Sequence, residues 1–389
     1  MTAQSQVSQT FVTHFCALFR TRHEGRIPAL ALLIFGLVRA CSVSVPSVAK
    51  SLLLVDDEVA QQSLERRFRR WLSNHLVSVE EVWTELSPTL LADWAGRAVV
   101  LVFDVTPHRA TWVILTIGIV HQDRVLPLAA IVRPQQEPWD ESTVAAIRPA
   151  CTRIAAAMPA GATVTLLADQ GLTGPDLIDL CTKLGWHFTL RVNANETSTM
   201  RVRTQDGRTI HLIDLMPNHP ARTTRRVVIE GALYASAKWR QGWITIHWVP
   251  EADHPWILFS DLRGSSARVR EYTQRIRIEA TFQDLKRRGW NLEASHLRDD
   301  ERIERLVFAL ALAYWWMHLL GRRAIHHGLR HRYDRRERRD RSLVAIGRAF
   351  CADRLRSCGS VPRWFQRTAS GWRYPANLPK RRSAVQCVR

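Results

Sequence analysis

The sequence lacks the patterns that mark several enzyme classes. It has no G-x-x-x-x-G-K-[ST] run, which excludes a built-in P-loop ATP motor, and no G-x-S-x-G elbow that would indicate acyl transfer. No H-E-x-x-H spacing occurs among its 15 histidines. We therefore expect His108, His121 and His187, which lie near candidate strands, to make structural hydrogen bonds and not to bind metal.

Cysteine is sparse and shows no pattern. None of the seven cysteines forms a C-x-x-C pair, so the sequence predicts neither a zinc site nor a disulfide framework. An odd, scattered set of thiols is typical of a reducing compartment, and we expect a cytoplasmic protein. The cysteines are Cys16, Cys41, Cys151, Cys181, Cys351, Cys358 and Cys387.

Long apolar runs are also missing. Ile27–Val38 and Leu306–Leu320 both fall short of the roughly 20 residues that cross a bilayer, and arginines flank the second run. The first residues show no signal-peptide pattern. We interpret both runs as core helices and expect no membrane partner.

Positive charge, by contrast, is abundant. Lys and Arg total 55 against 36 Asp and Glu, which gives a net charge of +19 and an isoelectric point near 10.7. Such an excess favours a polyanionic partner, and nucleic acid more than a membrane surface. The segment Arg322–Arg341 carries nine arginines and no lysine, and the guanidinium of arginine binds phosphate in a bidentate way. A solvated helix or mobile tail would have the same composition.

The first part of the chain, residues 1–92, is predicted to be helical. Ile27–Ala40 is followed by a short helix over Val48–Leu53, capped by Ser44 or Ser47, and then by DDEVAQQSLERRFRRWL, with an acidic start and a basic end. This order resembles a helix-turn-helix DNA-binding unit, although many helical domains share it.

From Arg97 the pattern changes to β-strands. RAVVLVFDVT, TWVILTIGIV and RVLPLAAIV predict an antiparallel meander; a helix near Glu141–Met158, a strand ending at Asp169, a helix from Pro175 to Leu184 and a further strand follow. This order resembles the ribonuclease-H-like fold, so we expect an α/β domain with a mixed sheet over residues 93–320.

Two further regions complete the predicted organisation. Short β runs at about 196–260 are too long a block for a loop, and we interpret them as a β-strand insertion into the predicted α/β domain. Residues 321–389 form a basic, helical C-terminal region expected to contact DNA or a second subunit.

Two aspartates follow predicted hydrophobic strands. Asp104 and Asp169 each stand at such a strand end, where ligands of α/β sheets usually collect. A single Asp there is more often a turn or helix cap. Adjacent carboxylates repel unless a cation lies between them, and hard oxygen ligands favour Mg²⁺ or Mn²⁺. Two such ions can bind both the attacking and the leaving oxygen of a phosphoryl displacement.

A third carboxylate stands in YTQRIRIEATFQDLK. Tyr272, Arg275, Glu279 and Lys286 have offsets of 0, 3, 7 and 14, which places them on one face of a continuous helix. The glutamate would hold metal while the two cations bind phosphate oxygens. The alternative is an Arg275–Glu279 salt bridge on a solvated helix, with Tyr272 packed nearby.

This spacing resembles the YREK signature of bacterial insertion-sequence transposases, family four of the DDE class. FDVT around Asp104, ADQGLTG around Asp169 and the β block before Glu279 are also similar, so the resemblance spans roughly Leu53–Leu320. It implies that Asp104, Asp169 and Glu279 are catalytic and hold divalent metal, Mg²⁺ or Mn²⁺, as two ions. Tyr272, Arg275 and Lys286 would then bind DNA phosphates near the transposon end.

Trp256 and Phe282 are two further positions at which the chain can be compared with this family. Trp256, in PWILFSDL, matches a tryptophan that in relatives stacks on a flipped base and so binds DNA. With fifteen tryptophans in the chain, core filling is nearly as good an interpretation. Phe282 departs from the family, because some relatives have a polar residue there.

The resemblance implies a cut-and-paste DNA transposase. It would cleave double-stranded DNA at transposon-end inverted repeats and transfer the 3′-hydroxyl into target DNA. A homodimer in the synaptic complex and a nucleoid-associated location in the bacterial cytoplasm follow as expectations. One alternative is a catalytically inactive relative that acts as a repressor, and another is a nuclease without strand transfer. The intact triad with Arg275 and Lys286 favours the active enzyme.

Overall fold

The described residues of the computed structural model divide into two compact units. The first holds the described residues of Met1–Leu167, Thr182–Trp186 and Gln274–Phe365, and the second those of Ala168–Cys181 and His187–Thr273. The structure describes residues 3–19, 25–53, 57–136, 138–193, 200–218, 223–234, 238–286 and 289–358. Of the predicted C-terminal region, the part beyond residue 358 lies outside these ranges.

The predicted N-terminal helices are present in the first unit. The short helix begins at Val45 and not at Val48, because Pro46 is well suited to the first turn of a helix. Phe11 stacks on Phe35 with ring centroids 5.2 Å apart and lies 4.5 Å from Trp316. The helices are α1 (Ala3–Cys16), α2 (Arg26–Ala40), α3 (Val45–Ser51), α4 (Glu58–Ser73) and α5 (Val79–Leu91).

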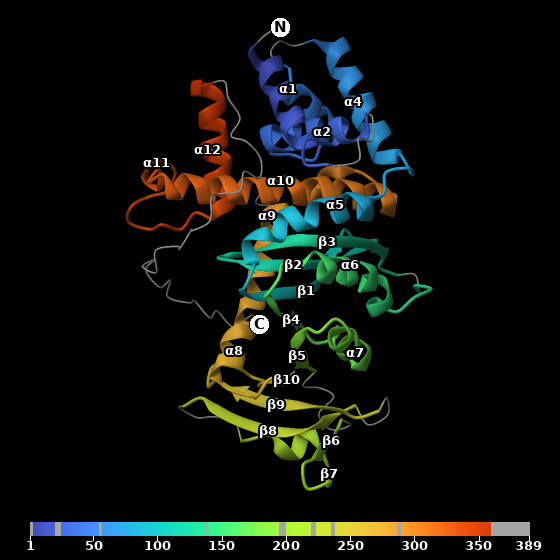
Figure 1. The fold of residues 1–389 in the computed structure, drawn as a ribbon, viewed down its shortest axis with the longest axis vertical. Coiled ribbons are helices and arrows are strands. Elements are labelled where there is room, and N and C mark those ends of the chain that lie inside the picture. Colours follow the sequence, from blue (N-terminus) through green and yellow to red (C-terminus); the bar gives the residue numbers. More distant parts are fainter. Residues whose placement is uncertain are drawn as a thin grey trace. The chain divides into compact units, whose positions relative to one another are not determined.

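A long apolar helix, α10 (Asp300–His326), forms the centre of the first unit (Figure 1). It packs against α2 and α4 as well as against strand β3 (Arg124–Pro134), so the 1–92 region shares a core with part of the predicted 93–320 domain. By length and composition, α10 and the bent pair α2–α3 are apolar enough to span a membrane, but 89% of the apolar stretch of α10 is buried in the protein. Such burial is typical of a core helix.

The C-terminal helix α12 (Leu343–Cys358) crosses α10 at two glycines. A Cβ atom on Gly321 would collide with the carbonyl oxygen of Leu343, and one on Gly347 with that of Met317. The two backbones therefore touch at this crossing, which no residue with a side chain would allow. The short helix α11 (Arg330–Tyr333) lies between them in the chain.

The predicted meander is confirmed in the first unit, where the strands run in the order β3-β2-β1-β4. Asp104 of β1 pairs with Thr116 of β2, and β2 continues antiparallel to β3. The bounds are β1 (Ala98–His108), β2 (Trp112–His121), β3 (Arg124–Pro134) and β4 (Thr163–Ala168), with α6 (Thr143–Ala157) between β3 and β4.

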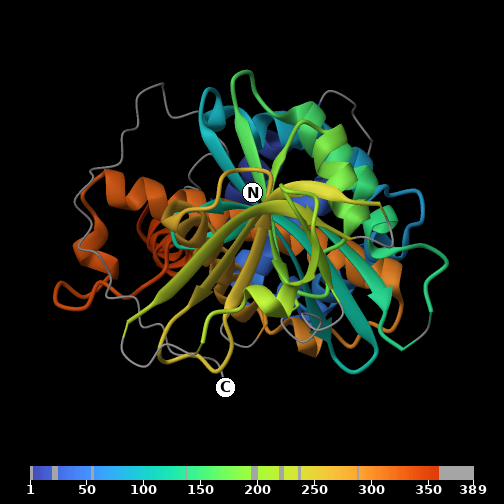
Figure 2. The ribbon, with the colours of Figure 1, turned by 90° about the horizontal axis from the view of Figure 1, so that it is seen from below.

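The β-strands predicted at about 196–260 are present in the second unit. Its strands run in the order β5-β10-β9-β8-β6-β7, and β8 and β9 form a long twisted antiparallel ribbon (Figures 1 and 2). The elements are α7 (Pro175–Lys183), β5 (His187–Val192), β6 (Arg201–Thr204), β7 (Thr209–His211), β8 (Arg225–Leu233), β9 (Arg240–Trp248), β10 (Trp256–Ser260) and α8 (Ser266–Tyr272).

The prediction of one continuous helix from Tyr272 to Lys286 is wrong. Tyr272 ends α8, a 3₁₀ turn covers Thr273–Ile276, and α9 (Arg277–Leu285) ends before Lys286. The hydroxyl of Thr273 donates to the carbonyl of Arg270 at 2.6 Å, a local bond that competes with helix continuation. No glycine or proline marks this break in the sequence.

The histidines His108, His121 and His187 differ in their hydrogen-bond partners. Nδ1 of His121 lies 2.6 Å from Nε2 of the buried His318, and His187 bonds Asp261 at 2.6 Å, as expected of structural histidines. His108 is buried, and neither ring nitrogen has a hydrogen-bond partner among the described residues, so that expectation was wrong for this histidine.

We expect the His121–His318 pair to destabilise the protein in acid. Burial lowers the pKa of His121 from 6.5 to about 3 and that of His318 well below 6.5. The unfolded chain takes up protons below pH 6.5 while the folded pair does not, so stability is complete above that pH and falls toward pH 3. Urea titration should give a free energy of unfolding about 4 kcal/mol lower at pH 5 than at pH 7.5, about 2 kcal/mol for each histidine. His318→Gln, whose amide does not titrate, should show a flatter profile; an equally steep one would contradict the assignment.

Candidate active site

Asp104 lies within β1, and not at its end as predicted, because Thr106, Pro107 and His108 continue the pairing with β2. Its side chain is mostly buried, at 13% exposure. Oδ2 accepts a hydrogen bond from Nη1 of Arg275 at 2.8 Å, and Oδ1 accepts from the backbone N–H of Val105 at 2.8 Å. The carboxylate therefore faces a buried cation.

Arg275 brings two of the predicted carboxylates together in the first unit. Its Nη2 lies 3.6 Å from Oε1 of Glu279, while its shorter bond goes to Asp104. The arginine side chain is 11% exposed and Glu279 47% exposed. The sequence left open a solvated Arg275–Glu279 ion pair. In the structure the arginine is buried between two carboxylates, and removing either partner of a buried ion pair destabilises a protein more than removing a solvated one.

Lys286 contacts the same strand as Asp104. Its ammonium donates to Oγ1 of Thr106 at 2.8 Å and to the backbone carbonyl of Pro107. The lysine thus reaches β1 two residues beyond Asp104, in the first unit. Its predicted contact with DNA phosphate remains a prediction.

Asp169 follows β4 and belongs to the second unit. Its Oδ1 accepts hydrogen bonds from the hydroxyl of Tyr272 at 3.0 Å and from the backbone N–H of Gln170 at 2.9 Å. Nη1 of Arg191 lies 3.5 Å from the same oxygen. Sequence reasoning missed Arg191; the available signal was a cation in the apolar strand FTLRV.

Tyr272 and Trp256 form an aromatic pair in the second unit. Their rings meet edge to face at 5.3 Å and 75°, and they pack with Leu258 and Val269. Tyr272 is buried, and Trp256 is partly buried. Packing therefore accounts for part of the role of Trp256, and base stacking remains a prediction.

Helix α9, which carries Glu279, is anchored mainly to β3 by polar and apolar contacts. Arg124 bonds Asp284 at 2.7 Å, and the hydroxyl of Thr281 donates to the carbonyl of Val125 at 2.9 Å. Ile278 belongs to a buried cluster with Val102, Val125 and Leu167, and Phe282 packs against this cluster. The position at which the sequence departs from the family is thus used for packing.

A sequence model described as the transposase DDE domain matches residues 94–316, more than half of the chain. The chain belongs to the DDE transposase family. Its mixed α/β architecture agrees with the ribonuclease-H-like fold of this family, and DNA is the partner that the family indicates. The comparison with curated proteins found no match to this transposase.

The chemistry of the three carboxylates fits the divalent metal that DDE transposases generally use, because Mg²⁺ and Mn²⁺ prefer hard oxygen ligands. Within the described ranges, no three His, Cys, Asp or Glu side chains are grouped as a metal site. Instead, Arg275 forms ion pairs with Asp104 and Glu279. Asp169 accepts a hydrogen bond from Tyr272 and forms an ion pair with Arg191. A metal ion would compete with these donors for the carboxylates.

Proposed function

We propose that this DDE transposase cuts double-stranded DNA at the ends of its own insertion sequence and joins the freed 3′-hydroxyl to target DNA. Asp104, Asp169 and Glu279 are the proposed catalytic metal ligands, and the YREK spacing supports the proposal that the chain belongs to family four. One observation carries the proposal: a single buried arginine, Arg275, binds both Asp104 and Glu279. Two carboxylates far apart in the sequence thus share one cation, as metal ligands would.

The bound metal, proposed as two ions of Mg²⁺ or Mn²⁺, would supply charge stabilisation at the transferring phosphoryl group and an activated water. Asp104 and Glu279 hold the negative charge that attracts it in the first unit. Asp169 does so in the second, where the O–H of Tyr272 fixes its Oδ1. Because Tyr272 is 2% exposed, we assign it a positioning role and not the phosphate contact inferred from sequence.

The cations of the site bind DNA in this proposal. Lys286 has a flexible stem and three donors, which suits a phosphate oxygen once its bond to Thr106 is exchanged. Arg275 would turn from the carboxylates toward phosphate when metal takes its place. Trp256 is kept as the proposed stacking partner for a base at the transposon end. A homodimer that joins two ends in the nucleoid completes the proposal.

The test uses the purified full-length chain and labelled duplex from the end of its element, with Mg²⁺, Mn²⁺ or EDTA. We expect nicking and joining at the element's end with either metal, and binding alone in EDTA. Binding without cutting in all three conditions would favour a repressor and reject the catalytic assignment. Cutting without joining would indicate a nuclease.

A further inference from the structure

The helices α2, α3 and α4 form a compact three-helix group in the first unit. The axis bends by 90° between α2 and α3. The buried face of α4 carries Phe68, Trp71 and Leu72, and the indole N–H of Trp71 donates to the carbonyl of Arg26 at 3.0 Å. This packing leaves the opposite face of α4 turned to solvent.

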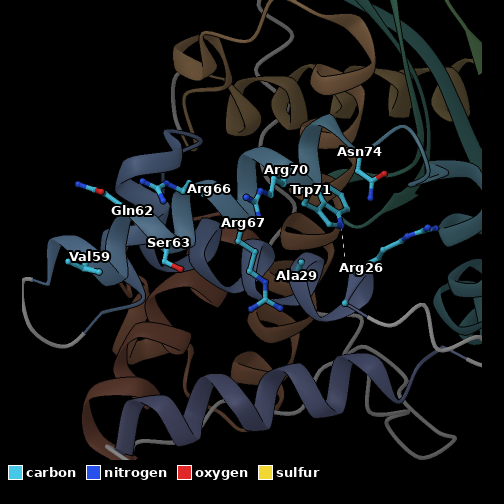
Figure 3. Close-up of a pocket in the computed structure, with 11 residues that line it drawn as sticks. Arg26, Ala29, Val59, Gln62, Ser63, Arg66, Arg67, Arg70, Trp71 and Asn74 are labelled. Atoms are coloured by element: carbon cyan, nitrogen blue, oxygen red, sulfur yellow. Dashed lines mark hydrogen bonds between the residues drawn. The ribbon is translucent and has the colours of Figure 1, made fainter.

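That face carries a polar, basic stripe. Arg66, Arg67 and Arg70 are exposed, and Gln62 and Ser63 precede them on the same side, since roughly 100° separates successive residues. They line an open groove of about 730 Å³ whose other side is formed by Arg26 and Ala29 of α2 (Figure 3). The residues that line it are Gly25, Arg26, Ala29, Val59, Gln62, Ser63, Arg66, Arg67, Arg70, Trp71 and Asn74.

The basic stripe carries arginines without carboxylates, whereas the neighbouring flank of α4, which holds Glu65 and Arg69, carries both charges. The described lining of the groove contains four arginines and no carboxylate. On the flank, Arg69 is paired with Glu65 at 2.9 Å and lines a different groove. The stripe thus concentrates positive charge with hydrogen-bonding amide and hydroxyl groups.

We propose that α4 enters the major groove of double-stranded DNA and reads the end of the element. A helix fits the major groove, which is about 12 Å wide. Gln62 and Ser63, in the first half of the helix, suit base edges, as the early residues of a recognition helix do. Arg66, Arg67 and Arg70 suit guanine edges or phosphates. Val59 is the one large apolar side chain on this stripe, so the described face lacks the apolar surface of a membrane-binding helix.

The inference rests on the proposed function for the identity of the DNA, and its test needs no catalysis. The full-length chain is titrated in EDTA with labelled duplex from the element's end and with a duplex of shuffled sequence, over a range of salt. Arg66→Ala, Arg67→Ala and Arg70→Ala are combined in one variant. We expect about 100-fold weaker binding at low salt, and a log K against log salt slope shallower by about 2 to 3.

Two further variants separate base reading from charge. Gln62→Ala should lower the preference for the end duplex about tenfold and leave the salt slope unchanged. Arg69→Ala, the matched control on the same helix, should bind within about twofold of wild type, since its charge is paired on the flank. Thermal melting confirms folding, which alanine in a helix should preserve.

The proposal is overturned if the triple variant binds both duplexes as wild type does, or if Arg69→Ala loses as much affinity. Loss of binding to phosphatidylserine vesicles alone, with DNA binding intact, would instead assign the stripe to a membrane. Because metal is absent throughout, a chain that never cuts DNA can still pass this test. Failure here and failure of the catalytic proposal are therefore separate results.

Discussion

Glu279→Gln is expected to lower metal-dependent cutting by about a thousandfold or more, and to leave DNA binding in EDTA unchanged. Glutamine keeps the shape and one oxygen but removes the charge that holds a divalent cation. Loss of a residue that only supports a metal ligand already costs about 10- to 100-fold, so loss of a ligand should cost more. Glu279 is 47% exposed and 3.6 Å from Arg275, so the fold should tolerate the change.

The measurement compares cutting rates of wild type, Glu279→Gln and Glu81→Gln on the same labelled duplex. Glu81 is an exposed glutamate at the start of α5, and its variant should cut as wild type does. If Glu279→Gln also cuts at the wild-type rate, Glu279 is not a metal ligand and the triad assignment is wrong.

Arg275→Ala should lower the free energy of unfolding by about 3 kcal/mol, because it leaves the buried carboxylate of Asp104 without its cation. Mg²⁺ should restore part of this loss, since a divalent ion can replace the guanidinium between Asp104 and Glu279. Arg275→Lys should be intermediate, because lysine keeps the charge but not the forked geometry.

Urea unfolding with and without Mg²⁺ measures both effects. Arg270→Ala provides the control: this arginine is exposed at the end of α8, and its loss should change stability by less than about 0.5 kcal/mol. A loss at Arg275 that Mg²⁺ does not reduce would contradict metal binding by Asp104 and Glu279, and would leave Arg275 a purely structural residue.

The sequence predicted the elements whose signal is local. Apolar, β-branched runs separated by short turns marked the β1–β3 meander and the strands of the insertion, and both are confirmed. The family match over residues 94–316 confirms that the chain is a DDE transposase and includes the stretch around Glu279.

The predictions that failed had no signal in the local sequence pattern. The break at Thr273 has no glycine or proline to announce it, and helical spacing alone favoured one continuous helix. The ion pair between Arg191 and Asp169 could not be predicted, because it depends on how β5 and the end of β4 are placed after folding. The packing of α2 on α10 likewise joins the first helices to a segment far along the chain.

The glycine crossing of α10 and α12 also bears on how the protein is made. Helix α2 and its neighbours bury their apolar faces against α10, and α10 in turn needs the backbone of α12. During synthesis the N-terminal helices leave the ribosome long before either partner exists. The newborn chain therefore carries uncovered apolar surface until its last described helix emerges, and chains that stop short of α12 are expected to be cleared by proteases and not to accumulate as truncated competitors for DNA.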